Sequence, residues 1–177
     1  MTRTAAREIA VRLIYAQSLT GAGTDELLEN FFEGEHYETL TDEDKLFAQK
    51  IDGAQKDYIS VLVRRVNEHS QELDDYLLKY ASGWKPERIS KTARAALRCA
   101  MCEILYLNDA PVRAAINEAV ELVKSYDDQE TVSFVNGVLG GFMRGEMGES
   151  VPVEAEEVPV EAEEVPVEAA ETPEGDA

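Results

Sequence analysis

Apolar residues recur every three or four positions along most of the first 148 residues, the spacing that places them on one face of an α-helix. No stretch alternates apolar and polar residues over a useful length, so the pattern predicts no β-strand. Glycine, proline and helix-capping residues divide it into about seven segments. The expected helices cover residues 4–19, 24–34, 41–66, 70–80, 86 or 90 to 107, 112–126 and 129–144. The chain is therefore predicted to be all-α.

The last two predicted helices carry polar residues that a plain core helix would not need. Asn117 sits beside an apolar stripe, and Asn136-Gly137 lies inside an apolar run where the pair would normally signal a turn. Glycine inside a helix costs roughly 1 kcal/mol relative to alanine. We therefore expect Gly137, and Gly53 in the third helix, to mark close helix contacts. We expect Asn117 and Asn136 to be buried amides that satisfy backbone groups near such a crossing.

The composition changes abruptly after Gly148. Residues 151–157 recur as 158–164 and, with one change, as 165–171, and each repeat contains a proline, which excludes a coiled coil. Residues 149–177 hold 11 acidic residues and no basic one, which leaves 25 acidic and 17 basic residues in 1–148, a formal charge of −8 against −19 overall. Such a segment buries too little to fold. We predict one helical domain (1–148) and a disordered acidic tail (149–177), with electrostatic shielding favoured over an interaction role.

The sequence offers no sign of a membrane segment, a metal site or a catalytic centre. It has no run of about 18 apolar residues and no apolar signal segment at its start. Cys99 and Cys102 have the CxxC spacing but lie in a helical run, and His36 and His69 are each isolated, so packing between helices is the expected role of the cysteines. We expect a cytoplasmic, non-enzymatic protein without a cofactor.

Two cationic strips are candidates for contact with nucleic acid. Arg3 and Arg7 share a helix face with Val11 and Tyr15, whose ring could stack on a base or contact a partner. A second strip consists of Lys91, Arg94 and Arg98. For both strips the alternative is an ordinary solvated helix face, which the pattern alone favours. Trp84 is expected to be a core aromatic residue beside the break at Pro86.

Four motifs resemble those of a known family. They are Ala6-Arg7-Glu8-x-Ala10-Val11-x-x-x-Tyr15, Leu97-Arg98-x-Ala100-x-x-Glu103, Ala115-Ile116-Asn117-Glu118-Ala119-Val120-Glu121-Leu122 and Phe134-Val135-Asn136-Gly137-Val138-Leu139. With these motifs the chain resembles the NusB family of bacterial transcription antitermination factors over residues 3–144. The resemblance implies two packed three-helix bundles with an extra helix, and a non-catalytic function.

The resemblance also implies partners and site residues. NusB-like proteins pair with a small-subunit ribosomal protein, NusE, bind boxA-type single-stranded RNA, and join an RNA polymerase assembly that resists termination on ribosomal RNA operons. Some relatives self-associate, so a homodimer is one implied state. By motif position, the RNA face would comprise Arg3, Arg7, Lys124, Tyr126, Glu130 and Phe134, and the partner face Tyr15, Glu87 and Arg94. Core packing is the alternative role for Phe134.

The chain departs from the family pattern in its charge. Only Arg3 and Arg7 precede Arg12 where relatives have a denser arginine cluster, and the domain itself is acidic. The sequence therefore predicts weak RNA binding without the protein partner. Two alternatives stay open: a purely protein-binding helical adaptor, and the NusB-like domain of an RNA cytosine methyltransferase, which would need a cofactor-binding domain downstream.

Overall fold

The computed structural model describes residues 1–33, 46, 50–107 and 110–148, and within these ranges every regular element is a helix. The α-helices there are α1 (Arg3–Thr20), α2 (Thr24–Glu33), α4 (Gly53–Glu68), α5 (Ser70–Tyr80), α6 (Lys91–Cys102), α7 (Val112–Lys124) and α8 (Gln129–Phe142). Shorter turns are the 3-10 helix η1 (Pro86–Arg88) and the π-helical η2 (Glu103–Leu107) and η3 (Met143–Met147). The prediction of an all-α chain is confirmed. The predicted disorder of 149–177 falls outside the described residues.

Polar side chains fix the starts of four of these helices. Thr2, Asp52, Ser90 and Asp128 each accept a hydrogen bond from the backbone N–H three residues further on, before α1, α4, α6 and α8. At the other end of α1, Gly21 adopts the left-handed conformation with a φ of 70°. Local chemistry therefore sets these boundaries, which is why the sequence could predict most of them to within a few residues.

The predicted third helix differs from the structure at its beginning. Residues 50–52 are not helical, and α4 begins at Gly53 with Asp52 as its cap. Gly53 therefore starts a helix instead of interrupting one. A Cβ atom there would meet no atom within 4 Å, so the predicted close contact at Gly53 is wrong. The predicted cap Thr41 lies outside the described residues.

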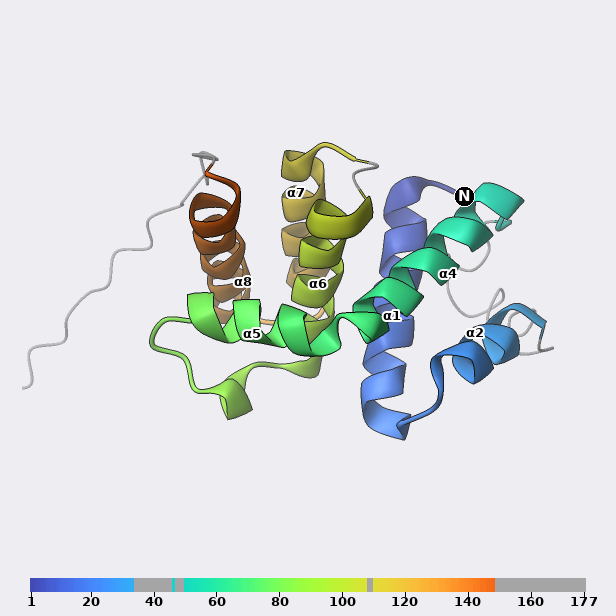
Figure 1. Cartoon of the computed structure of the whole chain (residues 1–177), viewed down its shortest axis with the longest axis horizontal. Coiled ribbons are helices and arrows are strands. Elements are labelled where there is room, and N and C mark those ends of the chain that lie inside the picture. Colours follow the sequence, from blue (N-terminus) through green and yellow to red (C-terminus); the bar gives the residue numbers. More distant parts are fainter. Residues whose placement is uncertain (34–45, 47–49, 108–109, 149–177) are drawn as a thin grey trace, which may run out of the picture.

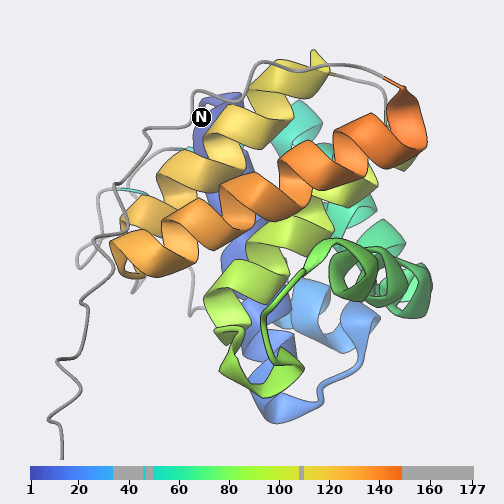
Figure 2. The ribbon, with the colours of Figure 1, turned by 90° about the vertical axis from the view of Figure 1, so that its left-hand side faces the viewer.

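The helices form two groups joined by α6. The first group contains α1, α2 and α4, and the second contains α6, α7 and α8 with α5 lying across them (Figures 1 and 2). Helix α6 packs against α1 and α4 on one side and against α5, α7 and α8 on the other. Leu97 in its middle and Met101 near its end are fully buried. This arrangement agrees with the expected pair of packed three-helix bundles and one extra helix.

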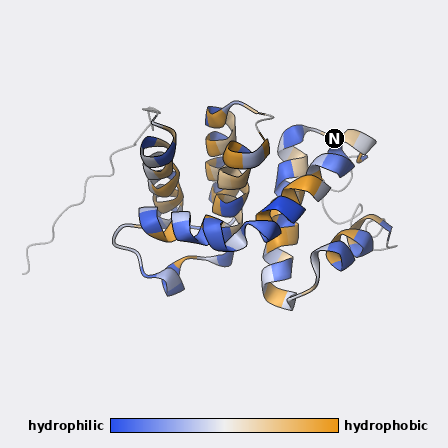
Figure 3. Ribbon diagram, viewed as in Figure 1, coloured by the Kyte–Doolittle hydropathy of each residue, from blue (hydrophilic) through white to orange (hydrophobic). Residues whose placement is uncertain are grey.

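The outward side of α5 is mostly polar. Figure 3 shows α5 as largely hydrophilic on the side facing the viewer, in keeping with its only two buried residues, Leu73 and Leu77. No helix in the described part of the chain combines the length and the apolar character needed to cross a membrane.

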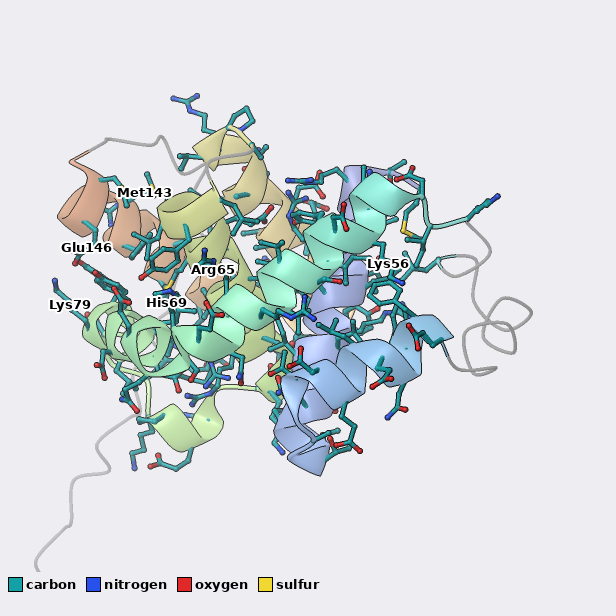
Figure 4. The ribbon with its side chains drawn as sticks, turned by 45° about the vertical axis from the view of Figure 1, so that its right-hand side comes forward. Lys56, Arg65, His69, Lys79, Met143 and Glu146 are labelled. Atoms are coloured by element: carbon teal, nitrogen blue, oxygen red, sulfur yellow. The ribbon has the colours of Figure 1, made fainter. Side chains whose placement is uncertain are left out.

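The end of the last helix is fixed onto α5 by Tyr80. Cβ atoms built on Gly141 and Gly145 would lie 3.0 Å from Tyr80 Cδ1 and 2.0 Å from Tyr80 Oη, so the tyrosine ring fills the space that two side chains would occupy. Its hydroxyl donates to Glu146 Oε1 at 2.6 Å, and Lys79 Nζ donates to the same oxygen at 2.5 Å. Lys79 and Glu146 lie side by side in Figure 4. The close glycine contact of α8 is therefore at this end.

The predicted roles of Gly137, Asn117 and Asn136 are consequently wrong. A Cβ atom on Gly137 would meet nothing within 4 Å, and the residue is exposed. Asn117 is exposed and Asn136 is half-buried, so neither is the buried amide expected at a tight crossing. The two asparagines lie beside the buried faces of α7 and α8 and not within them.

Candidate nucleic-acid and partner interface

Tyr126 presents an exposed ring at the corner where α1 meets the connection between α7 and α8. It is 46% exposed, and its hydroxyl donates to Glu8 Oε1 at 2.7 Å while accepting from Arg12 Nε at 2.9 Å. Arg12 also pairs with Glu8 at 2.7 Å. Partial burial and the hydrogen bond to Glu8 raise the pKa of Tyr126. The hydroxyl is thus fixed by α1, and the ring is held at the surface in one orientation.

Apart from Arg12 of α1, the charged residues around the connection between α7 and α8 are mostly acidic. Lys124 is exposed and pairs with Glu121 at 2.7 Å, and Glu130 is exposed in the first turn of α8. Between residues 118 and 130 the sequence has five acidic residues and one lysine. Lys124, Tyr126 and Glu130 are all exposed around the connection between α7 and α8, and the charges of this rim are poorly suited to contact phosphates.

Phe134 does not belong to this exposed rim. It is 7% exposed, and its ring centroid lies 4.4 Å from that of Trp84, at an interplanar angle of 35°. A ring that is already covered cannot stack on a base without repacking. Of the two roles that the sequence left open for Phe134, core packing is the one found, and Trp84 is its half-buried partner.

Arg7 is also removed from the predicted RNA face, because it is 3% exposed. Its Nε and Nη2 donate to the two carboxylate oxygens of Glu103 at 2.6 and 2.9 Å. Its Nη1 lies 3.2 Å from Glu118 Oε2, and Tyr58 donates to Glu103 Oε1 at 2.6 Å. Arg7 is buried because its face of α1 packs between α4, η2 and α7, where a guanidinium can be buried only if it is paired.

This buried network explains several motif residues together. Burial alone would lower the pKa of Arg7, but the hydrogen bonds to Glu103 and the charges of Glu103 and Glu118 together raise it and hold the guanidinium charged. Burial, and then the charge of Glu103, raise the pKa of Tyr58, which stays neutral and donates. Thr4 adds a 2.9 Å hydrogen bond to Glu118. Arg7, Glu103 and Glu118 therefore connect three helical elements from inside, and their role is structural.

Arg3 stays at the edge of this network. It is half-buried, and its guanidinium carbon lies 3.4 Å from the ring centroid of Tyr58. That contact is a cation–π interaction, which holds the guanidinium near the start of α1. Of the two arginines predicted to face RNA, Arg3 is the one that remains accessible.

The residues predicted to contact a protein partner lie around the N-terminal end of α6. Tyr15 in α1 is 37% exposed, and Glu87 in η1 is exposed. Arg94 is half-buried, donates to the carbonyl of Pro86 at 3.3 Å and lies 3.5 Å from Asp74 Oδ2. Lys91 donates at 3.4 Å to the carbonyl of Ser18, one turn beyond Tyr15. The start of α6 thus lies against both η1 and the second half of α1.

A groove of about 140 Å³ follows the junction of α1 and α6. Lys91, Arg94 and Arg98 all line it, together with Ile14, Ser18 and Ala95. The predicted cationic strip therefore exists, but its members are partly neutralised. Arg98 makes a bidentate pair with Asp74 at 2.8 and 2.6 Å, and Arg94 shares the same carboxylate. Arg94 and Arg98 therefore mainly form ion pairs that join α6 to α5.

Sequence reasoning missed the residues that hold Tyr126 in place. The Glu8–Arg12 pair was visible from its four-residue spacing, but its contact with a tyrosine 114 residues away was not. The two cysteines are buried and free, as expected, and burial raises the pKa of both thiols, that of Cys102 to about 12. Among the described residues, no group of three or more His, Cys, Asp or Glu side chains could hold a metal ion.

The fold and these surfaces define a class of protein: an all-helical binding module with a buried charge network, an exposed tyrosine on an acidic rim and a cation-lined groove between α1 and α6. A family model described as the NusB family matches residues 4–144. The chain belongs to the NusB family.

Similar proteins agree with this assignment. The transcription antitermination protein NusB of Clostridium botulinum (strain Kyoto, type A2) is 34% identical over 140 residues, covering 79% of this chain and 98% of the relative. That of Acetivibrio thermocellus is 39% identical over 140 residues, covering 79% and 87%. A crystal structure of the antitermination factors NusB and NusE with double-stranded RNA contains a chain that is 26% identical, with a TM-score of 0.64, covering 80% of this chain and 96% of that one.

Proposed function

We propose that this chain is a transcription antitermination factor that binds boxA-type single-stranded RNA together with the ribosomal protein NusE, within an RNA polymerase assembly. The observation that carries the proposal is that Tyr126 is exposed at the corner where α1 meets the α7–α8 connection, and that its hydroxyl is fixed there by Glu8 and Arg12. Exposed aromatic rings beside a few cations are the usual means of holding single-stranded RNA. The similarity to a chain crystallised with NusE and RNA supports it.

The acidic rim around Tyr126 supports a dependence on the protein partner. With five acidic residues and one lysine between residues 118 and 130, this chain supplies little local attraction for phosphates. A partner that adds its own cations would offset this deficit. The Tyr15, Glu87 and Arg94 region around the start of α6 is the proposed site of that partner.

The test is a titration of the full chain with a boxA-like RNA and with a scrambled RNA, each with and without NusE, at several salt concentrations. We expect weak binding alone, tighter and sequence-selective binding with NusE, and a steep loss as salt rises. Tyr126→Ala is expected to cost about 1–3 kcal/mol of RNA binding, the usual contribution of one stacked base. Tyr15→Ala, the control, should reduce only the gain from NusE.

A second candidate function is a helical adaptor that binds protein only, and the acidic rim is the observation that favours it. NusE binding without any RNA contribution from this chain, and with Tyr126→Ala indistinguishable from wild type, would establish the adaptor and exclude the main proposal. Tight, salt-insensitive RNA binding by the isolated chain would contradict the proposed dependence on NusE.

Deleting residues 149–177 is expected to strengthen RNA binding and leave the helical fold intact. The deletion removes 11 acidic residues, and the family model matches residues 4–144 only, so the helical domain is expected to fold without them. The gain should shrink as salt rises, because it comes from removing charge repulsion. RNA titration and thermal unfolding measure the two effects. A chain of full length with these 11 acidic residues changed to their amides is the control for length. Loss of cooperative unfolding in the truncated chain would show a structural role for the tail.

A further inference from the structure

The segment between α5 and α6 (residues 81–90) carries two cations that have no ion-pair partner among the described residues. Residues 84–98, which run from this segment into α6, contain five basic residues and one acidic residue, in a domain whose formal charge is −8. Lys91, Arg94 and Arg98 have protein partners. Lys85 and Arg88 are exposed, and within the described part of the chain neither side chain makes an ion pair or a hydrogen bond. These two charges are available to a ligand.

Trp84 holds one of these cations at the surface. The Arg88 guanidinium carbon lies 5.9 Å from the centroid of the Trp84 ring, within the range of a cation–π interaction. The ring is itself supported by Phe134 of α8 at 4.4 Å. A guanidinium held over a fixed ring keeps its N–H donors free, and such donors match the geometry of a phosphate.

This segment adjoins the Tyr126 corner. Ser90 Oγ donates to Asp127 Oδ2 at 3.0 Å, so the end of the segment touches the residue that follows Tyr126. Phe134, which supports Trp84, follows the same α7–α8 connection. In Figure 1 the segment runs below α6 and α8, on the side where α7 ends and α8 begins. An RNA strand stacked on Tyr126 would therefore have these cations on one side of it.

We propose that Lys85 and Arg88 form a phosphate-binding subsite for the single-stranded RNA that stacks on Tyr126, with Trp84 as the positioning residue for Arg88. The subsite rests on the proposed function. It adds cations beside a rim where Arg12 and Lys124 are already paired with Glu8 and Glu121, and it contacts the backbone of the strand and not its bases. It therefore contributes to affinity and to salt dependence without contributing to sequence preference.

The test compares two variants that each remove two exposed cations from the full chain. Lys85→Gln/Arg88→Gln removes the subsite. Arg113→Gln/Arg144→Gln, the control, removes exposed cations at the start of α7 and beyond the end of α8. Arg113 and Arg144 lie at the ends of α7 and α8 that are far from the connection containing Tyr126. Binding of fluorescent boxA-like and scrambled RNA is measured with NusE present, from low to high salt.

The subsite variant is expected to lose about tenfold or more in RNA affinity near 0.1 M salt, equally for both RNA sequences. The plot of log K against log salt should become less steep, by about 0.7 in the size of its slope per lost phosphate contact. The control should keep the wild-type slope. Trp84→Leu is expected to reduce the slope as Arg88→Gln alone does, because Arg88 keeps its charge but loses the ring that holds it.

Equal slopes in the subsite variant and the control, with wild type binding RNA, would overturn the subsite and leave the proposed function standing. An unchanged affinity for RNA with a lower affinity for NusE alone would also overturn it, in favour of a protein contact. A lower affinity with an unchanged slope in Trp84→Leu would overturn the positioning role of Trp84. Absence of RNA binding by wild type with NusE would overturn the proposed function itself.

Discussion

Replacing Arg7 by methionine is expected to lower the free energy of unfolding by about 3–5 kcal/mol, the usual cost of removing one partner of a buried ion pair. Methionine fills much of the same space, so the loss is mainly electrostatic. It would leave Glu103, 4% exposed, with the hydroxyl of Tyr58 as its remaining partner of the network. It would also release Glu118 from its contact at 3.2 Å, and with it a link between α1 and α7.

Urea unfolding followed by circular dichroism measures this loss. Arg65→Met is a matched control, because Arg65 pairs with Glu68 at 3.3 Å on an exposed face and should cost no more than about 1 kcal/mol. Adding Glu103→Gln to Arg7→Met should recover part of the loss, since the amide removes the uncompensated charge and still accepts from Tyr58. A loss no larger than that of Arg65→Met would show that the network contributes little to stability.

The helices were predictable because their signals are local. The three-and-four spacing of apolar residues and the caps Ser90 and Asp128 lie within the segments that they define. The charge balance of the α7–α8 rim could also be read directly, and Lys124, Tyr126 and Glu130 are exposed as expected. Their contact with RNA stays a prediction.

The role of Arg7 was not predictable from local pattern. Arg3, Arg7, Val11 and Tyr15 repeat every four residues, which suggests one continuous surface, but the structure buries Arg7 and Val11 and exposes Tyr15. The difference comes from Glu103, which is 96 residues away in sequence. A buried arginine and an RNA-binding arginine give the same sequence pattern, and only the partner carboxylates separate them.

The glycines of α8 gave a similar error. The pair Asn136-Gly137 is unusual within a helix and led to the prediction of a close contact there, whereas nothing in the local pattern distinguishes Gly141 or Gly145. The structure reverses this, since the ring that requires glycine belongs to Tyr80 of α5. Sequence spacing shows where a helix lacks side chains, but the neighbouring element decides whether that space is used.

Gly145→Ala and Gly137→Ala are therefore expected to change stability in opposite directions. At Gly145 the new Cβ would lie 2.0 Å from Tyr80 Oη and 2.7 Å from its Cζ, so the stiff ring must move and its hydrogen bond to Glu146 is lost. Such overpacking typically costs about 1–3 kcal/mol. At Gly137 the Cβ meets open space on an exposed helix face, where alanine should stabilise by up to about 1 kcal/mol.

Thermal and urea unfolding of both variants decide the matter, with Tyr80→Phe as a further probe. Removing the hydroxyl takes away the closest contact of Gly145→Ala but leaves the one with Cζ, so the double variant should recover only part of the loss. If Gly145→Ala stabilised the protein as Gly137→Ala does, the ring of Tyr80 would have to be mobile, and α5 would not fix the end of α8. Lys79→Met alone should have a much smaller effect, because the ion pair of Lys79 with Glu146 is exposed and Tyr80 still donates to Glu146.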